Sequence, residues 1–447
     1  MKMIYGVKDK PKFHQLIVFA FQQLLAIMAA TIAVPMIVGN GMSTSAALFG
    51  AGIGTLVYIA FTRAKSPVFL GSSFAFLGSM AAAFAGATSA GLGYVGLIIG
   101  AAMAGLVYVV IAIVVKLVGV KWISKLMPPV VIGPIVAIIG LSLSGNAIGD
   151  LQKPVLEGGQ NYVAIICGLV TLAVVMLCSV YGKKTARLIP FIIGILAGYA
   201  VATAFYFIGK ATGNADLMVI DYSALVDNFK TISLQSFVSL PDFTFIKAFG
   251  SFSELTPAYI GTIAAAFTPV AFVVFAEHIA DHKNLSSIIE HDLLEDPGLS
   301  NTLLGDGVGS MVGAFFGGCP NTTYGESVGC VAITKNASVR TILVTAIEAI
   351  LISFITPFVA FLSTIPSCVM GGVCIALYGF IAVSGLKMLQ KVDLDDNRNL
   401  FTASVILVAG VGGMVLNFGN VTITEVACAL ILGILTNVML SKKKKSK

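Results

Sequence analysis

The sequence has 447 residues, of which 57% are hydrophobic and only 11% are charged. Soluble domains carry about 25% charged residues, so this composition excludes an ordinary soluble protein and indicates a chain that lies in lipid. The net charge of +6 comes from basic residues in short loops, and we therefore expect no nucleic-acid partner.

Fourteen apolar segments follow one another along the chain, separated by short polar breaks. They are 14–38, 44–62, 72–87, 91–115, 128–146, 161–181, 187–209, 257–280, 299–316, 324–334, 340–363, 366–385, 399–416 and 423–441. The third and the tenth are too short to cross a hydrocarbon core about 30 Å thick as helix alone. The sequence predicts an all-α polytopic membrane protein with fourteen transmembrane segments, two of them irregular.

The charge of the connections supports this count. Every second connection is basic, namely 62–66, 116–125, 182–187, 335–340, 386–398 and the tail from Lys442. The alternate connections carry no Lys or Arg, namely 39–43, 88–90, 317–323, 364–365 and 417–422. Because cytoplasmic loops are enriched in Lys and Arg, we expect both termini in the cytoplasm. The connection 281–298 fits this pattern least well, since it has a single lysine among several acids.

The chain also carries signs of an internal duplication. Its longest connection, 210–255, separates two groups of seven segments. Met127–Gly133 resembles Ile365–Gly371 and each opens the fifth segment of its group, while Pro67 precedes the third segment as Pro320 precedes the tenth. Seven is an odd number, so the second copy must be inverted. Inverted repeats with interrupted helices at the midplane are typical of transporters, and we predict a 7+7 inverted repeat.

Two stretches, Pro67–Phe74 and Pro320–Glu326, combine a helix-breaking proline with turn-forming residues inside apolar sequence. Irregular backbone at bilayer depth persists only where it is buried in protein or lines a water-filled cavity. We expect each stretch to form a short strand that pairs with the other and leads into a half-helix. The N-termini of these half-helices would point free N–H groups at a ligand. The alternative is a pair of ordinary kinks in a helix bundle.

Ionisable residues inside the apolar segments are candidates for function. Glu277 and Asp281 lie four residues apart and share one helix face. Two carboxylates this close in a medium of low dielectric favour uptake of a proton, which coupling to a proton gradient requires. For His278 a structural hydrogen bond and a role in the site are equally open. For His282 we expect the polar end of a helix at the cytoplasmic surface.

Further polar residues lie within the spans. We expect Asp306 either to orient the acidic cluster or to carry the proton, with a structural partnership as the alternative. Gln22 and Gln23 either donate hydrogen bonds into the core near the site or bridge helices. Glu348 is one more acid within a span, without an evident partner.

A planar and mostly neutral molecule with alternating N–H and C=O groups suits these residues. Glu277 and Glu326 would accept hydrogen bonds from ring N–H groups, and amides near Phe74 and Gly325 would donate to carbonyl oxygens. Phe74 and Tyr324 would supply apolar faces. An anion carrier would instead need a cationic residue here. The sequence presents no nucleophile–base pair and no metal-ligand set, so we expect a protein that is not an enzyme and that uses no cofactor other than a proton as coupling ion.

Five stretches are spread in order along the chain: Leu70–Phe76, Ala276–His282, Asp296–Gly298, Pro320–Glu326 and Gly329–Lys335. Together they resemble the motifs of the nucleobase–ascorbate transporter family, in particular its bacterial uracil permease branch. The resemblance implies proton-coupled import of a nucleobase, above all uracil, by a homodimer in the bacterial cytoplasmic membrane. A purine symporter of the same family and an anion transporter of the same architecture are the alternatives.

The resemblance also implies a division into a core domain and a gate domain that move past each other like an elevator. The expected core comprises 1–125 (spans 1–4) and 257–364 (spans 8–11). The expected gate comprises 126–256 (spans 5–7 with an extracellular loop) and 365–447 (spans 12–14 with a basic cytoplasmic tail).

Site residues follow by position from the same resemblance. The substrate-binding residues are Glu277, Glu326, Phe74, Gly325 and Tyr324. The residues linked to proton coupling are Asp281, Asp306 and Glu277. The supporting residues are Gln22, Ser73 and His278. Two departures bear on fine specificity: Ser327 stands where the family has Asn, and Gln22–Gln23 stands where it has a Gln–His pair.

Overall fold

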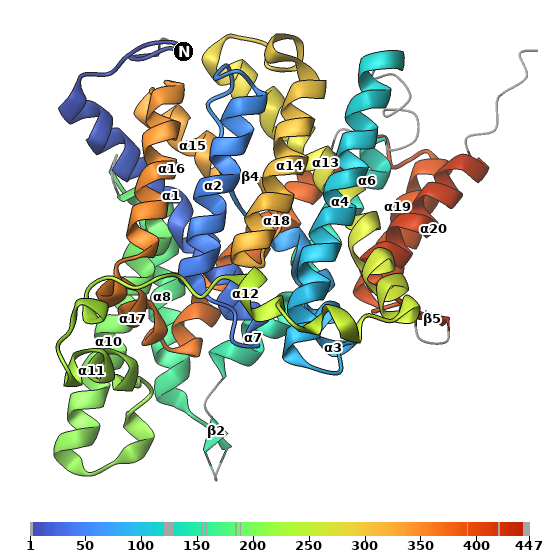
Figure 1. Cartoon of the computed structure of the whole chain (residues 1–447). Helices are drawn as coiled ribbons and strands as arrows, with labels where there is room; N and C mark the ends of the chain where they lie inside the picture. Colours follow the sequence, from blue (N-terminus) through green and yellow to red (C-terminus); the bar gives the residue numbers. More distant parts are fainter. Residues whose placement is uncertain are drawn as a thin grey trace, which may run out of the picture.

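The computed structural model describes residues 3–119, 128–152, 155–156, 159–183, 186–187, 189–390, 392–418 and 421–440. Most of these residues are helical, and the long helices run side by side through the molecule (Figure 1). In chain order these are α1 (Phe13–Val38), α2 (Thr44–Phe61), α4 (Ala90–Val118), α6 (Pro129–Ser142), α8 (Tyr162–Tyr181), α10 (Pro190–Thr212), α13 (Pro257–Ile289), α14 (Leu299–Gly317), α16 (Val339–Ser353), α18 (Ser367–Leu389), α19 (Asn397–Val411) and α20 (Glu425–Leu440). The shorter helical pieces are η1 (Phe74–Phe76), α3 (Leu77–Ala85), α7 (Ser144–Leu151), η2 (Ala215–Leu217), α11 (Ser223–Lys230), η3 (Leu234–Ser236), α12 (Thr244–Ala248), η4 (Ser251–Glu254), η5 (Leu294–Gly298), α15 (Gly325–Thr334) and α17 (Thr356–Ser363).

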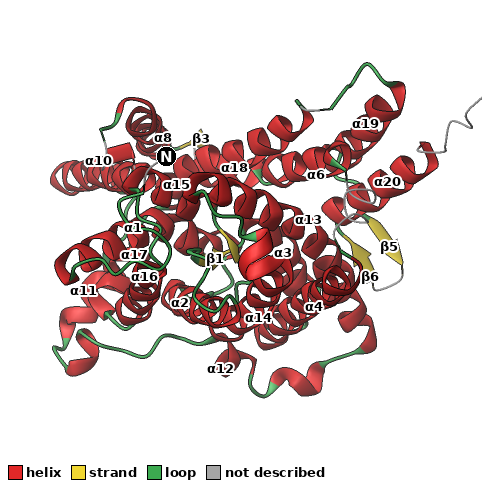
Figure 2. Cartoon of the chain, turned by 90° about the horizontal axis from the view of Figure 1, so that it is seen from above, coloured by secondary structure: helices red, strands yellow, loops and turns green. Residues whose placement is uncertain are grey.

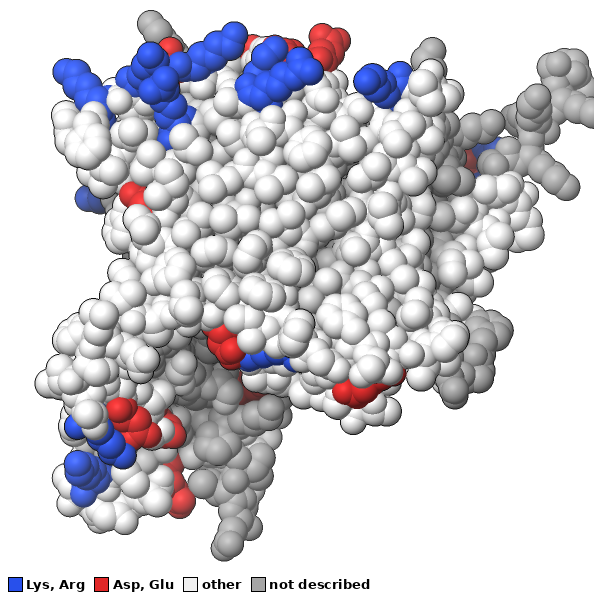
Figure 3. Space-filling model, viewed as in Figure 1, with Lys and Arg blue, Asp and Glu red and all other residues white. Residues whose placement is uncertain are grey.

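Within the described ranges, eight helical stretches are long and apolar enough to cross a membrane by length and composition. They are α1, α2, α4, α6 together with α7, α8, α10, α13 and α18. In Figure 3, Lys and Arg gather on the upper face, a few more lie beside Asp and Glu on the lower side, and the broad middle of the molecule is almost free of charge. The chain is thus a multi-pass membrane protein with one basic face, as its composition predicts. The cytoplasmic position of that face stays a prediction.

Two short strands lie in the middle of the molecule (Figure 2). β1 (Leu70–Ser72) pairs antiparallel with β4 (Asn321–Thr323), with Gly71 opposite Thr322. The amide of Ser73 extends the ladder by donating to the carbonyl of Pro320 over 2.9 Å. Both strands are fully buried, so the pairing satisfies backbone groups that water cannot reach. This confirms the predicted strand pair, and the alternative of two continuous kinked helices is wrong.

Each of the two central strands leads directly into a half-helix. β1 is followed by η1 and α3, and β4 by α15. α15 has 10 residues, which at 1.5 Å per residue gives roughly half the thickness of the hydrocarbon core. The prediction of a short strand plus a half-helix at the third and tenth segments is therefore confirmed.

One predicted segment is interrupted in the structure. Segment 340–363 forms α16, which ends at Ser353, and α17, which begins at Thr356. Pro357 lies in the first turn of α17, where its missing N–H is tolerated. In the interior of one long helix the same proline would remove a hydrogen bond and clash with the preceding turn. The expectation of a single uninterrupted span is wrong at this point.

The C-terminal segments are joined by a hairpin that the sequence did not predict. β5 (Leu416–Phe418) pairs antiparallel with β6 (Val421–Ile423). α19 ends at Val411, and Gly413 then has a φ of 68°, a conformation that glycine adopts without steric cost. The turn at this glycine ends the helix before the predicted limit at residue 416.

The strongest contacts between helices fall into two sets. In one set α2 packs against α14 and α16, α14 packs against α4, and α4 packs against α13. In the other, α18 packs against α6 and α8, α10 packs against α8, and α19 packs against α6 and α20. The connection between α10 and α13 contains α11 and α12 and runs across the lower side of the molecule in Figure 1.

In the first set, α2 and α14 approach each other so closely that their backbones are in direct contact. A Cβ atom at Gly54 of α2 would lie 2.7 Å from the carbonyl oxygen of Gly309 in α14. Small residues allow such close approach, and dispersion and packing then hold membrane helices together. The contact fixes the two helices that flank the central strands.

Gly54→Ala is expected to lower the free energy of unfolding by roughly 1–3 kcal/mol, because the added methyl group would lie 2.5 Å from Nδ2 of Asn321 in β4 and 2.7 Å from the carbonyl oxygen of Gly309 in α14, so that both have to shift. The measurement is the thermal melting of the purified protein in detergent. Gly145→Ala in α7 is the matched control, since a Cβ at Gly145 would meet nothing within 4 Å. An unchanged melting temperature for Gly54→Ala would refute the close contact.

Candidate functional site

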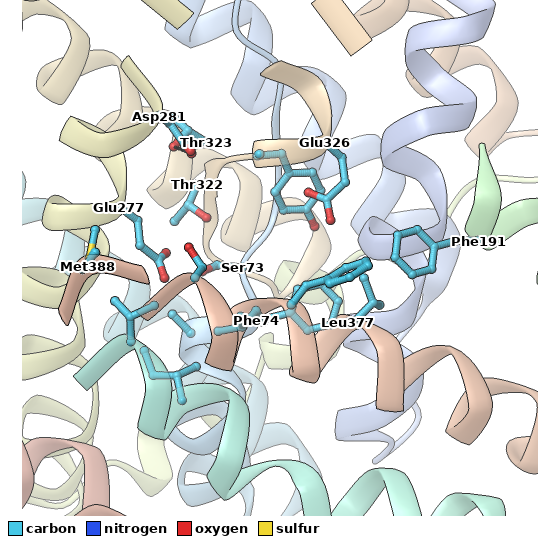
Figure 4. A pocket seen from close by; sticks show the side chains of 18 residues that line it. Ser73, Phe74, Phe191, Glu277, Asp281, Thr322, Thr323, Glu326, Leu377 and Met388 are labelled. Carbon is cyan, nitrogen blue, oxygen red and sulfur yellow. Dashed lines mark hydrogen bonds between the residues drawn. The ribbon is translucent and has the colours of Figure 1, made fainter. Parts of the chain in front are cut away.

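A cavity of about 410 Å³ lies beside the two strand–helix junctions. Residues of α13, of both junctions and of α6, α10 and α18 line it. Polar side chains come mainly from α13 and the junctions: Ser73, Glu277, Asp281, Thr322, Thr323 and Glu326 (Figure 4). The predicted site residues Phe74, Tyr324 and Gly325 line the same cavity. The structure thus brings together two sequence regions that lie more than two hundred residues apart.

The junction of β4 with α15 presents backbone and a carboxylate together. Glu326 lies in the first turn of α15, where the helix dipole favours a negative charge. A Cβ atom at Gly325 would touch nothing within 4 Å, so there is open space directly beside the main chain. A ligand in the cavity can therefore approach the first N–H groups of this half-helix.

Tyr324 lines the cavity, but its hydroxyl group is already occupied. It donates a hydrogen bond to the carbonyl oxygen of Ser72 in β1, and the ring lies against Gly71. The side chain therefore ties the two strands together and offers a ligand only its apolar ring.

The acidic pair on α13 faces the cavity. Glu277 and Asp281 are both half-buried and one helical turn apart. The Thr323 hydroxyl of β4 donates to Oδ2 of Asp281 over 2.7 Å. This hydrogen bond links Asp281 on α13 to β4, the strand that leads to Glu326.

The histidines of α13 point away from the cavity. His278 Nδ1 lies 2.7 Å from Oδ2 of Asp306 in α14, and its Nε2 lies 3.0 Å from Oγ1 of Thr302. His278 and Asp306 are both fully buried. The structure thus gives His278 a structural hydrogen bond. Asp306 does not belong to the cavity lining, and its hydrogen bond joins it to the site helix at His278.

The expectation for His282 is wrong. α13 continues to Ile289, so His282 lies well inside the helix and is fully buried instead of ending it at a polar surface. Its Nδ1–H donates to the carbonyl of His278 over 2.8 Å, which leaves Nε2 as the acceptor for the Tyr58 hydroxyl at 2.6 Å. The two imidazole rings stack with centroids 4.0 Å apart.

Asp306→Ala is expected to lower the free energy of unfolding by roughly 1–3 kcal/mol, because it leaves a nitrogen of the buried His278 ring without its partner. Thermal melting in detergent measures the effect, and Asp395→Ala at an exposed position is the control. Equal melting temperatures for the two variants would show that the buried pair contributes nothing to stability.

The first-segment glutamines differ in position. Gln22 is half-exposed and does not line the cavity. Gln23 is buried and donates from Nε2 to Oγ of Ser327 over 2.6 Å. Ser327 also accepts from the amide of Phe69 over 3.3 Å. The two positions that depart from the family pattern, Gln23 and Ser327, thus contact each other, and Ser327 directly follows Glu326 in the chain.

One side of the cavity was missed in the sequence. α6, α10 and α18 contribute Val136, Ile139, Phe191, Leu377, Phe380, Ile381, Ser384 and Met388. These residues lie in ordinary apolar spans, where no local signal separates a cavity wall from lipid-facing or core positions. Glu348 in α16 lies away from the cavity, and its Oε2 is buried without a hydrogen-bond partner among the described residues.

Solved membrane transporters share the fold. The transmembrane domain of a cyanobacterial bicarbonate transporter, BicA, aligns with a TM-score of 0.63 and 15% identity over 97% of this chain and 99% of that chain. The murine anion transporter Slc26a9 in its inward-facing state aligns with a TM-score of 0.62 and 12% identity over 97% of this chain and 69% of that one. At these identities the likeness concerns the fold alone.

Sequence comparison gives the family. The model of the Permease family matches residues 14–418. The uracil permease of Bacillus caldolyticus is 39% identical over 98% of this chain and 95% of its own length, and that of Bacillus subtilis is 36% identical over 99% and 96%. The uracil permease of Escherichia coli K12 is 36% identical over 96% of this chain and 92% of its own length. Because these matches span nearly the whole chain and are permeases, the protein belongs to the nucleobase–ascorbate transporter family of membrane permeases and is not an enzyme.

Proposed function

We propose that this protein is a proton-coupled symporter that imports a nucleobase, with uracil as the preferred substrate. One arrangement carries the proposal: Glu277 and Glu326 line the same cavity as the first turns of the two half-helices. The names of the three uracil permeases to which the chain is similar support the same substrate. A purine such as xanthine or uric acid is the second candidate within the family.

The chemistry of the cavity suits a uracil ring. An ionised carboxylate can only accept hydrogen bonds, so Glu277 and Glu326 accept from the ring N–H groups. Amides near Phe74 and at Gly325 donate to the ring carbonyl oxygens, and Phe74 covers an apolar face of the ring. Uracil is small against a cavity of about 410 Å³, a volume within the usual range of ligand sites.

The coupling ion in this proposal is a proton, which Asp281 binds while the ionised Glu277 holds uracil, and which the two acids share when the cavity is empty. Asp281 suits this role because it lines the cavity and its hydrogen bond comes from Thr323, at the end of the strand that leads to the substrate carboxylate. A change in ligand occupancy at Glu326 therefore alters the surroundings of the proton-binding group. Asp306 helps to hold α13 in position through its hydrogen bond with His278.

The proposed architecture has fourteen crossings in a 7+7 inverted repeat, with a core of residues 1–125 and 257–364 and a gate of residues 126–256 and 365–447. The two sets of helix contacts described above support this division. The antiparallel pairing of β1 from the first half with β4 from the second supports the inverted repeat. We further propose elevator-type movement of the core past the gate, a homodimer, and cytoplasmic termini in the bacterial cytoplasmic membrane.

Uptake of radiolabelled uracil into proteoliposomes tests this function. With an imposed pH gradient, acidic outside, we expect saturable accumulation that a protonophore abolishes. Thymine, xanthine, hypoxanthine, fluorouracil and bicarbonate are then added as competitors. Competition by bicarbonate but not by any nucleobase would assign the protein to anion transport, and absence of uracil uptake would refute the proposal.

A further inference from the structure

The cavity has two chemically different walls. α13 and the strand–helix junctions supply the carboxylates and most hydroxyl groups, whereas α6, α10 and α18 supply apolar side chains. In the described part of the chain, Ser384 is the single hydroxyl-bearing residue on this second wall. An apolar wall cannot recognise ring N–H or C=O groups, so it selects a ligand by shape.

Phe191 is the aromatic residue of this wall that lies deepest. It is 6% exposed, whereas the neighbouring Phe380 is 54% exposed. The two rings meet edge to face with centroids 6.1 Å apart and an interplanar angle of 78°. Phe380 therefore covers Phe191 and restricts its movement.

The start of α10 is also fixed against the half-helix that carries Glu326. Ile189, two residues before Phe191, packs against Ala26 of α1 and Cys330 of α15. Cys330 follows Glu326 by four residues and so lies one turn further along the same face of α15. Figure 4 accordingly shows Phe191 on the Glu326 side of the cavity, and Met388 on the Glu277 side.

We propose that Phe191 is the specificity-determining residue that restricts the cavity to single-ring bases. The proposal rests on the proposed function, because it concerns which nucleobases fit between the two carboxylates. With N1–H of uracil, the ring N–H beside the edge to which a second ring would be fused, held at Glu326, the covered Phe191 ring fills the space into which that second ring would extend. On the other side the flexible Met388 side chain can yield, so the limit is set at Phe191.

A comparison of uracil with xanthine tests the effect of ligand size while the hydrogen-bonding groups of the six-membered ring stay the same. Its six-membered ring carries the same N–H and C=O groups as uracil, and its second ring is fused to the edge that lacks them. The carboxylates and amides of the cavity therefore treat the two bases alike. Discrimination between uracil and xanthine then comes from the fused imidazole ring, through the space available to it and through its own N–H and ring nitrogen, which meet a mainly apolar wall.

Phe191→Ala tests the inference in full-length protein reconstituted in liposomes. Removing the phenyl group creates room for a fused ring, so the xanthine concentration that halves uracil uptake is expected to fall at least about tenfold, the size of effect that a shape contact in an apolar pocket produces. Uracil uptake itself is expected to continue with an affinity weakened by about tenfold or less. Phe207→Ala is the matched control, since Phe207 lies on the same helix and is 61% exposed.

Phe191→Leu accompanies the alanine variant in case the larger change prevents insertion. It retains aliphatic packing against Phe380, and we expect it to give an intermediate gain in xanthine competition. If both variants transport uracil and xanthine competes no better than in the unaltered protein, the inference is overturned. Failure of the proposed function has a different signature, because the unaltered protein would then take up no uracil.

Discussion

Glu326→Gln is expected to weaken uracil binding by one to two orders of magnitude. The carboxylate accepts a hydrogen bond from a ring N–H, and a hydrogen bond to a charged group contributes about 1.5–3 kcal/mol. The glutamine side chain has an NH2 donor as well as an acceptor oxygen. If the NH2 group faces the ring N–H of uracil, two donors meet and no hydrogen bond forms. Only the orientation with the oxygen toward uracil retains the bond. Equilibrium binding of radiolabelled uracil to the purified protein measures the change.

The same substitution is expected to shift preference toward single-ring bases that present an acceptor at this edge, such as cytosine. Glu348→Gln is the control, because it removes the charge of another acid within a span while leaving the cavity lining intact. Uracil affinity that is equal in the Glu326 and Glu348 variants would contradict the role assigned to Glu326.

Asp281→Asn is expected to abolish accumulation of uracil against a gradient while changing its binding affinity only a few-fold. Asparagine can still accept the hydrogen bond from Thr323 through its side-chain oxygen, so the strand β4 remains in position. It cannot bind and release a proton, however, and the coupling step is lost. Uptake driven by an imposed pH gradient measures coupling, and exchange of labelled for unlabelled uracil at equal pH measures transport without it.

Asp395→Asn, at an exposed position of the connection between α18 and α19, serves as the control for this experiment. An Asp281→Asn protein that still concentrates uracil in response to the pH gradient would rule out Asp281 as the coupling group. In that case Glu277 would be the remaining acid on the same helix face of the cavity.

The central features of this molecule are the ones that leave a clear signal in the sequence. Proline, threonine and glycine inside apolar sequence predict the paired strands and half-helices, because irregular backbone is costly in lipid and has to be paired or buried. Carboxylates at Glu277 and Glu326 stand out for the same reason. Both predictions depend on residues whose polar groups are energetically unfavourable in the hydrocarbon core unless they are paired or lie in a cavity.

The features that were missed depend on tertiary contacts between residues that are common in such segments. Phe191 and Leu377 do not differ from other apolar residues of their helices until α10 and α18 are packed around the cavity. His282 adjoins a polar connection, and only the position of Tyr58 on α2 reveals its buried hydrogen bond. No local pattern in the sequence predicts which distant helix supplies the hydrogen-bond partner.

The N-terminal segment is a further case of this kind. The amide of Ile4 donates to the carbonyl of Lys335, and the amide of Ala337 donates to the carbonyl of Tyr5. These backbone bonds join the start of the chain to the connection between α15 and α16. Backbone pairing of this kind involves no characteristic side chains, so no motif predicts it.

A structure of the protein with uracil bound tests the account most directly. The ligand is predicted to lie in the cavity between Glu277 and Glu326, with ring N–H groups within about 3 Å of the carboxylate oxygens and a ring carbonyl facing the amide of Gly325. Uracil bound outside this cavity, or within it but without a contact to either carboxylate, would contradict the account.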